Sequence, residues 1–229
     1  MIDWDILVIL DRSGSMQDAK ADHEGGLRAF VEDQKAMSGD VRFTLVQFDT
    51  TNPCEIVYDR VPIDAVEGIE LVPRGGTPLH DAIGKGVAHL KSRQAVEPSR
   101  QTLVMIVTDG EENSSTEWTL PRIKALVTEL EQAQVKVLFL GANIDAFAEG
   151  HAMGVAYAGT MPYTNTTGSV QAAYNVTSRK ILRSRTLQHM GASGQSISAA
   201  MDFTDEERAE VTGGTSSDVV TTTSTTGQE

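Results

Sequence analysis

The sequence contains a single cysteine, Cys54, so the chain cannot form an internal disulfide. Small extracellular domains often depend on disulfides, and a lone cysteine therefore favours a reducing compartment. No histidine lies near Cys54 in the sequence to activate its thiol. We expect Cys54 to have a structural role at the start of a strand.

Long apolar runs are also missing. No segment approaches the ~20 consecutive apolar residues that a membrane-spanning helix needs. The first residues, Met1 to Asp5, lack the basic and apolar regions of a signal peptide. The sequence therefore predicts a cytoplasmic protein that does not associate with membranes.

Basic residues are few compared with acidic ones. The chain has 19 Lys and Arg against 32 Asp and Glu, which gives a net charge of −13. Such a chain should not bind nucleic acid through a basic surface, and anionic membranes should repel it. An acidic protein partner would also be repelled, unless a bound cation made the local field positive.

What the sequence does contain is an alternation of apolar strands and amphipathic helices. Its 229 residues, of which 40% are hydrophobic, suffice for one packed domain. Segments 6–10 and 103–108 are continuous apolar runs, typical of strands buried on both faces of a parallel sheet. This alternation predicts an α/β fold. We expect strands at 6–10, 41–49, 56–58, 103–108, 135–141 and 155–158 and a loop at 161–168. We expect helices after Met16, after the N-caps Thr77, Thr119 and Ser169, and over residues 145–151.

A polar stretch, Asp11 to Met16, follows the first expected strand directly. Asp11, Ser13 and Ser15 alternate in it, and Gly14 allows a tight turn. Open α/β sheets bind ligands at this end of their strands, and a set of oxygen ligands favours Mg²⁺, Mn²⁺ or Ca²⁺. Taken alone, the stretch is equally compatible with a helix cap, because Asp and Ser are favoured there.

Two later stretches favour the metal site. The glycine loop 74–78 offers the hydroxyl of Thr77, and the apolar strand 103–108 ends at Asp109. Asp11, Ser13, Ser15, Thr77 and Asp109 resemble the metal-ion-dependent adhesion site of von Willebrand factor type A domains, whose pattern is Asp-x-Ser-x-Ser, a distant Thr and a distant Asp. The resemblance covers about residues 3 to 190.

The resemblance implies a Rossmann-like three-layer sandwich. Its central sheet would be mostly parallel, with segment 56–58 as one antiparallel edge strand and helices on both faces. The five residues would hold Mg²⁺, or else Mn²⁺ or Ca²⁺, and leave one coordination place for an Asp or Glu of a protein partner. The chain would be a stand-alone bacterial or phage-type member that serves adhesion or assembly and is not an enzyme.

Two other functions remain open. A sheet-end aspartate with Mg²⁺ can serve a hydrolase or phosphatase. The Asp-x-Asp arrangement of haloacid-dehalogenase-type phosphatases is absent, however, because residue 13 is Ser, and no Gly-x-Ser-x-Gly, Walker or dinucleotide-binding pattern is present. The other alternative is a structural metal in an assembly protein. The sequence indicates no oligomeric state.

The C-terminal part differs in character. We assign residues 1–190 to the domain and 191–229 to an extension. The last long helix carries a group of basic residues that we expect to form a solvated patch, namely Arg179, Lys180, Arg183 and Arg185. In the extension, the run from Phe203 to Arg208 predicts a capped acidic turn of helix. The Thr-rich end after Val219 has too few apolar side chains to fold alone.

Overall fold

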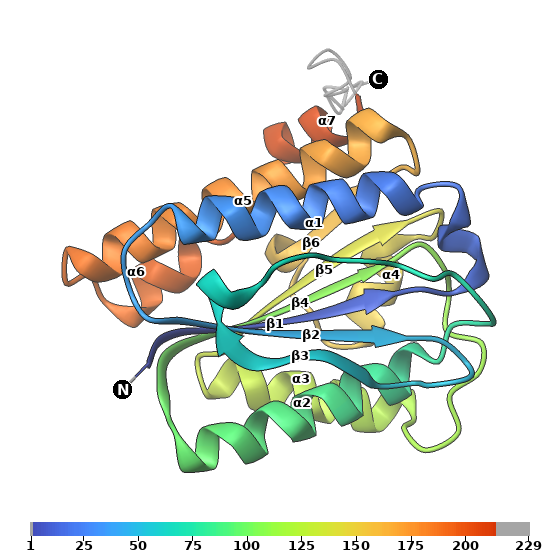
Figure 1. Cartoon of the computed structure of the whole chain (residues 1–229), viewed down its shortest axis with the longest axis horizontal. Helices are drawn as coiled ribbons and strands as arrows, with labels where there is room; N and C mark the ends of the chain where they lie inside the picture. Colours follow the sequence, from blue (N-terminus) through green and yellow to red (C-terminus); the bar gives the residue numbers. More distant parts are fainter. Residues whose placement is uncertain (1, 214–229) are drawn as a thin grey trace, which may run out of the picture.

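A six-stranded sheet forms the centre of the computed structural model, which describes residues 2–213 (Figure 1). Its order is β3-β2-β1-β4-β5-β6; β3 runs antiparallel to β2, and every other neighbouring pair is parallel. The mostly parallel sheet with one antiparallel edge strand is therefore confirmed. The strands are β1 (Ile2–Asp11), β2 (Val41–Phe48), β3 (Glu55–Pro62), β4 (Ser99–Thr108), β5 (Lys136–Ala142) and β6 (Thr160–Tyr163).

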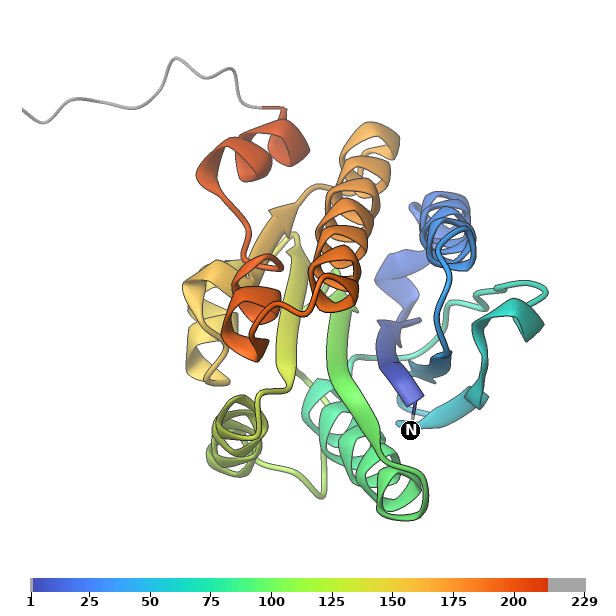
Figure 2. The same cartoon turned by 90° about the vertical axis from the view of Figure 1, so that its left-hand side faces the viewer.

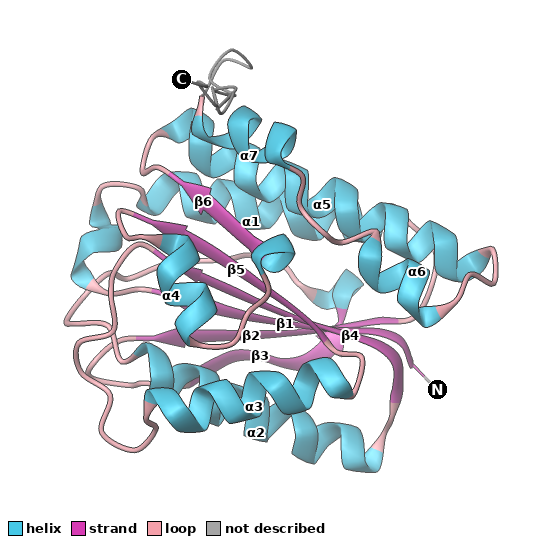
Figure 3. Cartoon of the chain, turned by 180° about the vertical axis from the view of Figure 1, so that it is seen from behind, coloured by secondary structure: helices cyan, strands magenta, loops and turns pink. Residues whose placement is uncertain are grey.

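Helices cover both faces of the sheet, which confirms the three layers (Figures 2 and 3). One face carries α1 (Lys20–Lys35) and α5 (Thr167–His189), and the other carries α2 (Leu79–Val96) and α3 (Leu120–Gln132). The shorter helices are α4 (Ala146–Ala152), α6 (Gly194–Ala199) and α7 (Asp205–Thr212), and the 3₁₀ turns are η1 (Gly14–Gln17), η2 (Ile63–Ala65) and η3 (Tyr157–Gly159). No helix among the described residues is both long and apolar enough to cross a membrane.

Strand β1 is buried on both faces and holds the two halves of the core together. Ile6, Val8 and Leu10 pack under α1 and α5, whereas Leu7 and Ile9 pack against α2 and α3. Because β2 and β4 flank β1 and run parallel to it, the carboxyl ends of these three strands lie at one edge of the sheet. Asp11 is the last residue of β1 and therefore lies at that edge.

The expected strand at 155–158 was wrong. Residues 157–159 form the turn η3, and β6 occupies 160–163, where we expected a loop to begin. Pro162 disfavoured a strand there, but β6 is an edge strand, and an edge strand tolerates a residue without an N–H group. Thr160 and Met161 pair with Phe139 and Leu140 of β5, so the sheet extends by one more parallel strand.

The start of α5 was also wrong, because its N-cap is Thr166 rather than Ser169. Ser169 instead accepts a hydrogen bond at Oγ from the backbone N–H of Thr164, at 2.8 Å. This contact fixes the corner between β6 and α5.

The expected basic patch on α5 does not form. Arg185 is 1% exposed and Lys180 is 8% exposed, whereas Arg179 and Arg183 lie on the surface. The Arg185 guanidinium donates to the backbone carbonyls of Gln34, Met37 and Ser38, at 2.7, 2.9 and 3.3 Å. The end of α1 offers carbonyls that lack helical partners, and Arg185 satisfies them in the interior.

The extension packs on the same core as the domain. Ile197, Met201, Phe203 and Val211 are all buried in the cluster under α1 and α5. The predicted capped turn is confirmed as α7, whose N-cap Thr204 forms a complete capping box. The Thr-rich end lies outside the described residues, and the division at residue 190 stays a prediction.

Helices α1 and α5 meet closely around His23. A Cβ at Gly26 would lie 2.3 Å from the Tyr174 ring, so only glycine allows this approach. His23 is buried beside the same ring, with its Nδ1 3.2 Å from the Tyr174 hydroxyl. Its Nε2 has no hydrogen-bond partner among the described residues. Burial lowers the pKa of His23 to about 4, because a charged imidazole would lose its hydration there.

We predict that His23 makes the fold acid-sensitive. Since its folded pKa is about 4 and its ordinary value is 6.5, the neutral ring stabilises the fold fully above pH 6.5 and progressively less as the pH falls toward 4. Between pH 7 and pH 5 this linkage costs about 2 kcal/mol. Urea unfolding of the wild type and of His23→Phe at both pH values measures it.

The loss of stability between pH 7 and pH 5 should be smaller in His23→Phe by that amount. The exposed His151 provides a matched control, and His151→Phe should keep the wild-type difference. Equal pH dependence in all three proteins would contradict the assignment.

Candidate metal site

The loop after β1 is held in place by hydrogen bonds to its own aspartate and to a second loop. The backbone N–H of Ser13 donates to Asp11 Oδ1 at 2.6 Å. The Thr108 hydroxyl, at the end of β4, donates to Asp11 Oδ2 at 2.7 Å. Gly14 N–H donates to the carbonyl of Gly75 at 3.0 Å, so the loop of Thr77 lies directly against this one.

Asp109 joins this group from the end of β4. Its Oδ1 accepts a hydrogen bond from Ser15 Oγ at 2.5 Å, and Ser15 Oγ lies 3.0 Å from Ser13 Oγ. Asp109 is 3% exposed and Ser13 is 2% exposed, whereas Ser15 is exposed. Oxygens from both strand ends therefore meet in one cluster that is accessible to solvent at Ser15.

Thr77 comes to the same cluster from the loop before α2. This helix begins at Leu79, one residue later than expected, and its N-terminus has no side-chain cap. The backbone of Thr77 is held instead by Asn113, which accepts from Thr77 N–H at 2.9 Å and donates its own N–H to the Thr77 carbonyl at 3.1 Å. A Cβ added to Gly110 would lie 3.2 Å from Thr77 Oγ1 and 3.7 Å from Ser15 Oγ, so the two hydroxyls flank this glycine.

The two aspartates receive hydrogen bonds from neutral groups. The donors to Asp11 and Asp109 in the described part of the chain are the hydroxyls of Ser15 and Thr108, the N–H of Ser13 and the amide of Asn165. Burial raises the pKa of Asp11 to about 6, and the Asp109 carboxylate adds to this rise, while the bonds from Thr108 and Ser13 oppose it. Two carboxylates close together in a buried place disfavour their own ionisation, and a cation would reverse that cost.

Asp49 differs from Asp11 and Asp109 because its carboxylate is paired with basic side chains. It is fully buried near the same loops, but its Oδ2 lies 2.6 Å from Arg12 Nε and 3.0 Å from Arg74 Nε. Its charge is already balanced by two guanidinium groups. This pairing makes Asp49 a poor ligand for a cation.

The chemistry of the cluster is compatible with a hard divalent cation. In an octahedral Mg²⁺ site with bonds of ~2.1 Å, neighbouring ligand oxygens are separated by about 3.0 Å, which is the distance between Ser13 Oγ and Ser15 Oγ. No group of three or more His, Cys, Asp or Glu side chains within residues 2–213 is arranged to hold a metal. The donor set here has two carboxylates and three hydroxyls, which favours Mg²⁺ or Mn²⁺ over softer metals.

Sequence reasoning missed three residues that support the cluster, namely Thr108, Asn113 and Asn165. Asn165 donates through Nδ2 to Asp109 Oδ2 at 2.8 Å. It stands two residues beyond the end of β6, as Ser13 stands two residues beyond the end of β1. This signal was hidden because the expected strand ended at residue 158.

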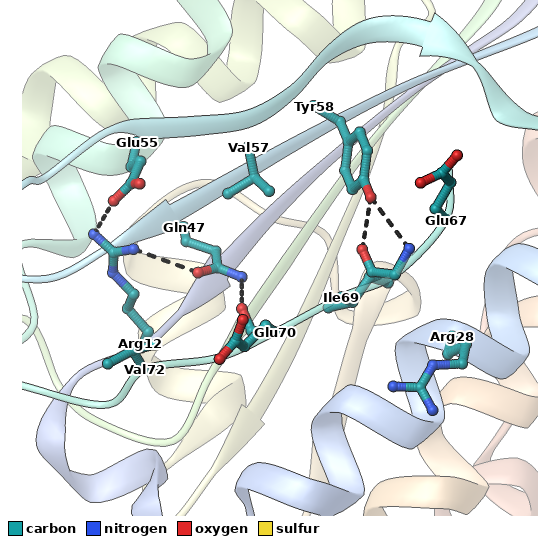
Figure 4. A pocket seen from close by; sticks show the side chains of 11 residues that line it. Arg12, Arg28, Gln47, Glu55, Val57, Tyr58, Glu67, Ile69, Glu70 and Val72 are labelled. Carbon is teal, nitrogen blue, oxygen red and sulfur yellow. Dashed lines mark hydrogen bonds and ion pairs between the residues drawn. The ribbon is translucent and has the colours of Figure 1, made fainter. Parts of the chain in front are cut away.

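A separate hollow of about 640 Å³ lies between β3 and segment 67–72 (Figure 4). Arg12 lines it, and its guanidinium contacts Gln47 Oε1 at 3.4 Å and forms an ion pair with Glu55. The side chain of Arg12 thus leaves the metal loop toward this hollow. None of the five predicted ligands lines it, so the hollow and the oxygen cluster are different places.

Solved structures with a similar fold have low sequence identity to this chain. The pilus adhesin SpaC from Lactobacillus rhamnosus GG, in its open conformation, aligns with a TM-score of 0.62 and 14% identity over 80% of this chain and 30% of that one. The SpRpn10 VWA domain aligns with a TM-score of 0.56 and 9% identity over 77% and 95%. Proximal thread matrix protein 1 from the mussel byssus aligns with a TM-score of 0.53 and 16% identity over 76% and 46%.

These likenesses show the fold. The chain spans about half the length of the mussel protein. Another structure of that protein has zinc in its MIDAS motif, the abbreviation for metal-ion-dependent adhesion site. Comparison with curated proteins gives no significant match. The family profile described as von Willebrand factor type A domain matches residues 5–182, which is most of the chain. The chain therefore belongs to the von Willebrand factor type A domain family.

Proposed function

We propose that this chain is a metal-dependent protein-binding module, in which Asp11, Ser13, Ser15, Thr77 and Asp109 hold Mg²⁺ or a similar divalent cation. The observation that carries the proposal is the pair of buried carboxylates, Asp11 and Asp109, whose donors are all neutral. The zinc-occupied motif of the mussel protein supports metal binding by a site of this type. Oxygen donors favour Mg²⁺ or Mn²⁺ here.

The partner group that suits such a site is a carboxylate. Three of the five donors are neutral hydroxyls, so the two carboxylates do not over-compensate the divalent charge, and an open coordination position on the cation could accept one further anionic oxygen. The chain has a net charge of −13, and an acidic partner would be repelled everywhere except at the cation. Ser15 is exposed, and a partner would approach on that side.

The geometry favours binding over phosphoryl transfer. An aspartate nucleophile needs an oxygen that can reach a substrate. Asp11 is 0% exposed, and both of its oxygens accept hydrogen bonds, from Ser13 N–H and from the Thr108 hydroxyl. This arrangement positions the carboxylate as part of a rigid site.

We predict that Asp11→Ala abolishes binding of Mg²⁺. The substitution removes one of the two charges that compensate the cation, and it leaves the Ser13 N–H and the Thr108 hydroxyl without their acceptor. Calorimetric titration with MgCl₂ measures the affinity, and circular dichroism checks that the variant is folded.

The exposed Asp18 in the following turn provides the control. Asp18→Ala removes the same charge from the same region and should keep the wild-type affinity. Unchanged Mg²⁺ affinity in folded Asp11→Ala would refute the site.

A second prediction tests Thr77 through its neighbour. Gly110→Ala would place a methyl group 3.2 Å from Thr77 Oγ1, so the hydroxyl must shift by a few tenths of an ångström. We expect an affinity for Mg²⁺ about 10-fold weaker, in the range seen when the surroundings of metal ligands are disturbed.

Gly68→Ala is the matched control, because no atom lies within 4 Å of its added Cβ. It should bind Mg²⁺ as the wild type does. Normal binding by Gly110→Ala would contradict the prediction that the position of the Thr77 hydroxyl limits the affinity for Mg²⁺.

A third prediction concerns the carboxylate, with acetate as the probe. In the Mg²⁺-loaded protein, acetate should shift the amide resonances of Ser13, Gly14 and Ser15, because the anion reaches the cation beside them. The same titration in EDTA, and a titration with sodium chloride at equal ionic strength, should leave these resonances in place. Equal shifts with and without Mg²⁺ would mean that the cation plays no part in capturing the anion.

A further inference from the structure

Asp109 is held on both of its oxygens. Ser15 Oγ donates to Oδ1 at 2.5 Å, and the amide of Asn165 donates to Oδ2 at 2.8 Å. Ser15 belongs to the loop after β1, but Asn165 belongs to the corner between β6 and α5. A fourth chain segment, from the far edge of the sheet, thus reaches the cluster (Figure 1).

The orientation of the Asn165 amide follows from its partner. An ionised carboxylate only accepts hydrogen bonds, so the NH₂ group of Asn165 must face Asp109. The carbonyl Oδ1 is then left as a buried acceptor with no hydrogen-bond partner among the described residues. A buried polar atom without a partner destabilises the fold, and a donor from solvent or from a bound ligand would satisfy it.

Two further contacts help to hold the corner that carries Asn165. The buried Tyr163 donates its hydroxyl to the backbone carbonyl of Thr108 at 3.0 Å, next to Asp109 in β4. On the other side, Thr164 N–H donates to Ser169 Oγ at 2.8 Å. Tyr163 and Asn165 therefore bind the end of β4 at two successive residues, Thr108 and Asp109. Because these contacts restrict the backbone around Asn165, its side chain is suited to orient the Asp109 carboxylate.

We infer that Asn165 is a positioning residue of the metal site, which holds Asp109 toward the cation. The inference rests on the proposed metal binding. Asn165 is neutral, so it orients Asp109 without cancelling the charge that attracts the cation. A bound cation fixes Asp109, and Asp109 in turn fixes the corner through the bond from Asn165.

The test compares Asn165→Ala and Asn165→Leu with the wild type. Both variants lose the hydrogen bond, and the leucine retains the volume of the side chain. Asn175, exposed on α5, provides the control Asn175→Ala. Titration with MnCl₂ should show affinity 10- to 100-fold weaker in both Asn165 variants, as for other residues that orient metal ligands, and unchanged affinity in the control.

Hydrogen exchange supplies a readout that general destabilisation would not reproduce. In the wild type and in Asn175→Ala, Mn²⁺ should slow exchange of the amides from Thr164 to Val170. In the Asn165 variants at saturating Mn²⁺, this slowing should be lost, while the metal loop from Ser13 to Ser15 is still protected.

Wild-type affinity together with wild-type protection in both Asn165 variants would overturn the inference and leave metal binding intact. A wild-type chain that binds no Mn²⁺ would instead refute the proposed function, so the two failures are distinguishable.

Discussion

The structure around the site depends on one electrostatic constraint, which is that two aspartates are buried together at the ends of neighbouring strands. Asp11 and Asp109 are 0% and 3% exposed, and neutral donors hold both. Among the other buried carboxylates of the described residues, Asp5 and Asp49 are paired with arginines, and Asp81 accepts hydrogen bonds from three backbone N–H groups of residues 116–118. Asp11 and Asp109 are the two that lie close together without a basic partner, at one edge of the sheet, and a divalent cation there would offset their repulsion.

The fold brings these groups together through strand order. β1 and β4 are neighbours in the sheet although more than 80 residues separate them in the chain, so Asp11 and Asp109 end at the same edge. The glycine loop before α2 brings Thr77, and the corner after β6 brings Asn165. At the other end of the sheet, near the start of β1, Arg185 ties α5 to the end of α1, and α6 and α7 complete the same core.

The central strands and the positions of the five candidate ligands could be predicted from the sequence, because their local patterns are distinctive. Strands such as 6–10 and 103–108 are continuous apolar runs, and a run of this kind has few alternatives to a buried strand. The Asp-x-Ser-x-Ser pattern placed Asp11, Ser13 and Ser15 at the end of one of them, and the structure brings Thr77 and Asp109 to the same cluster.

The contacts that depend on tertiary structure could not be predicted. Arg185 is buried because the end of α1 presents carbonyls to it, and nothing in the local sequence of α5 reveals that neighbour. Strand β6 has four residues and contains Pro162, so its local pattern is weak, and Asn165 was missed with it.

The most direct test of the proposed metal site is anomalous diffraction from crystals soaked in MnCl₂. The account predicts one strong peak at coordination distance from Ser13 Oγ and Ser15 Oγ, whereas a well-occupied peak elsewhere with none at these oxygens would contradict it.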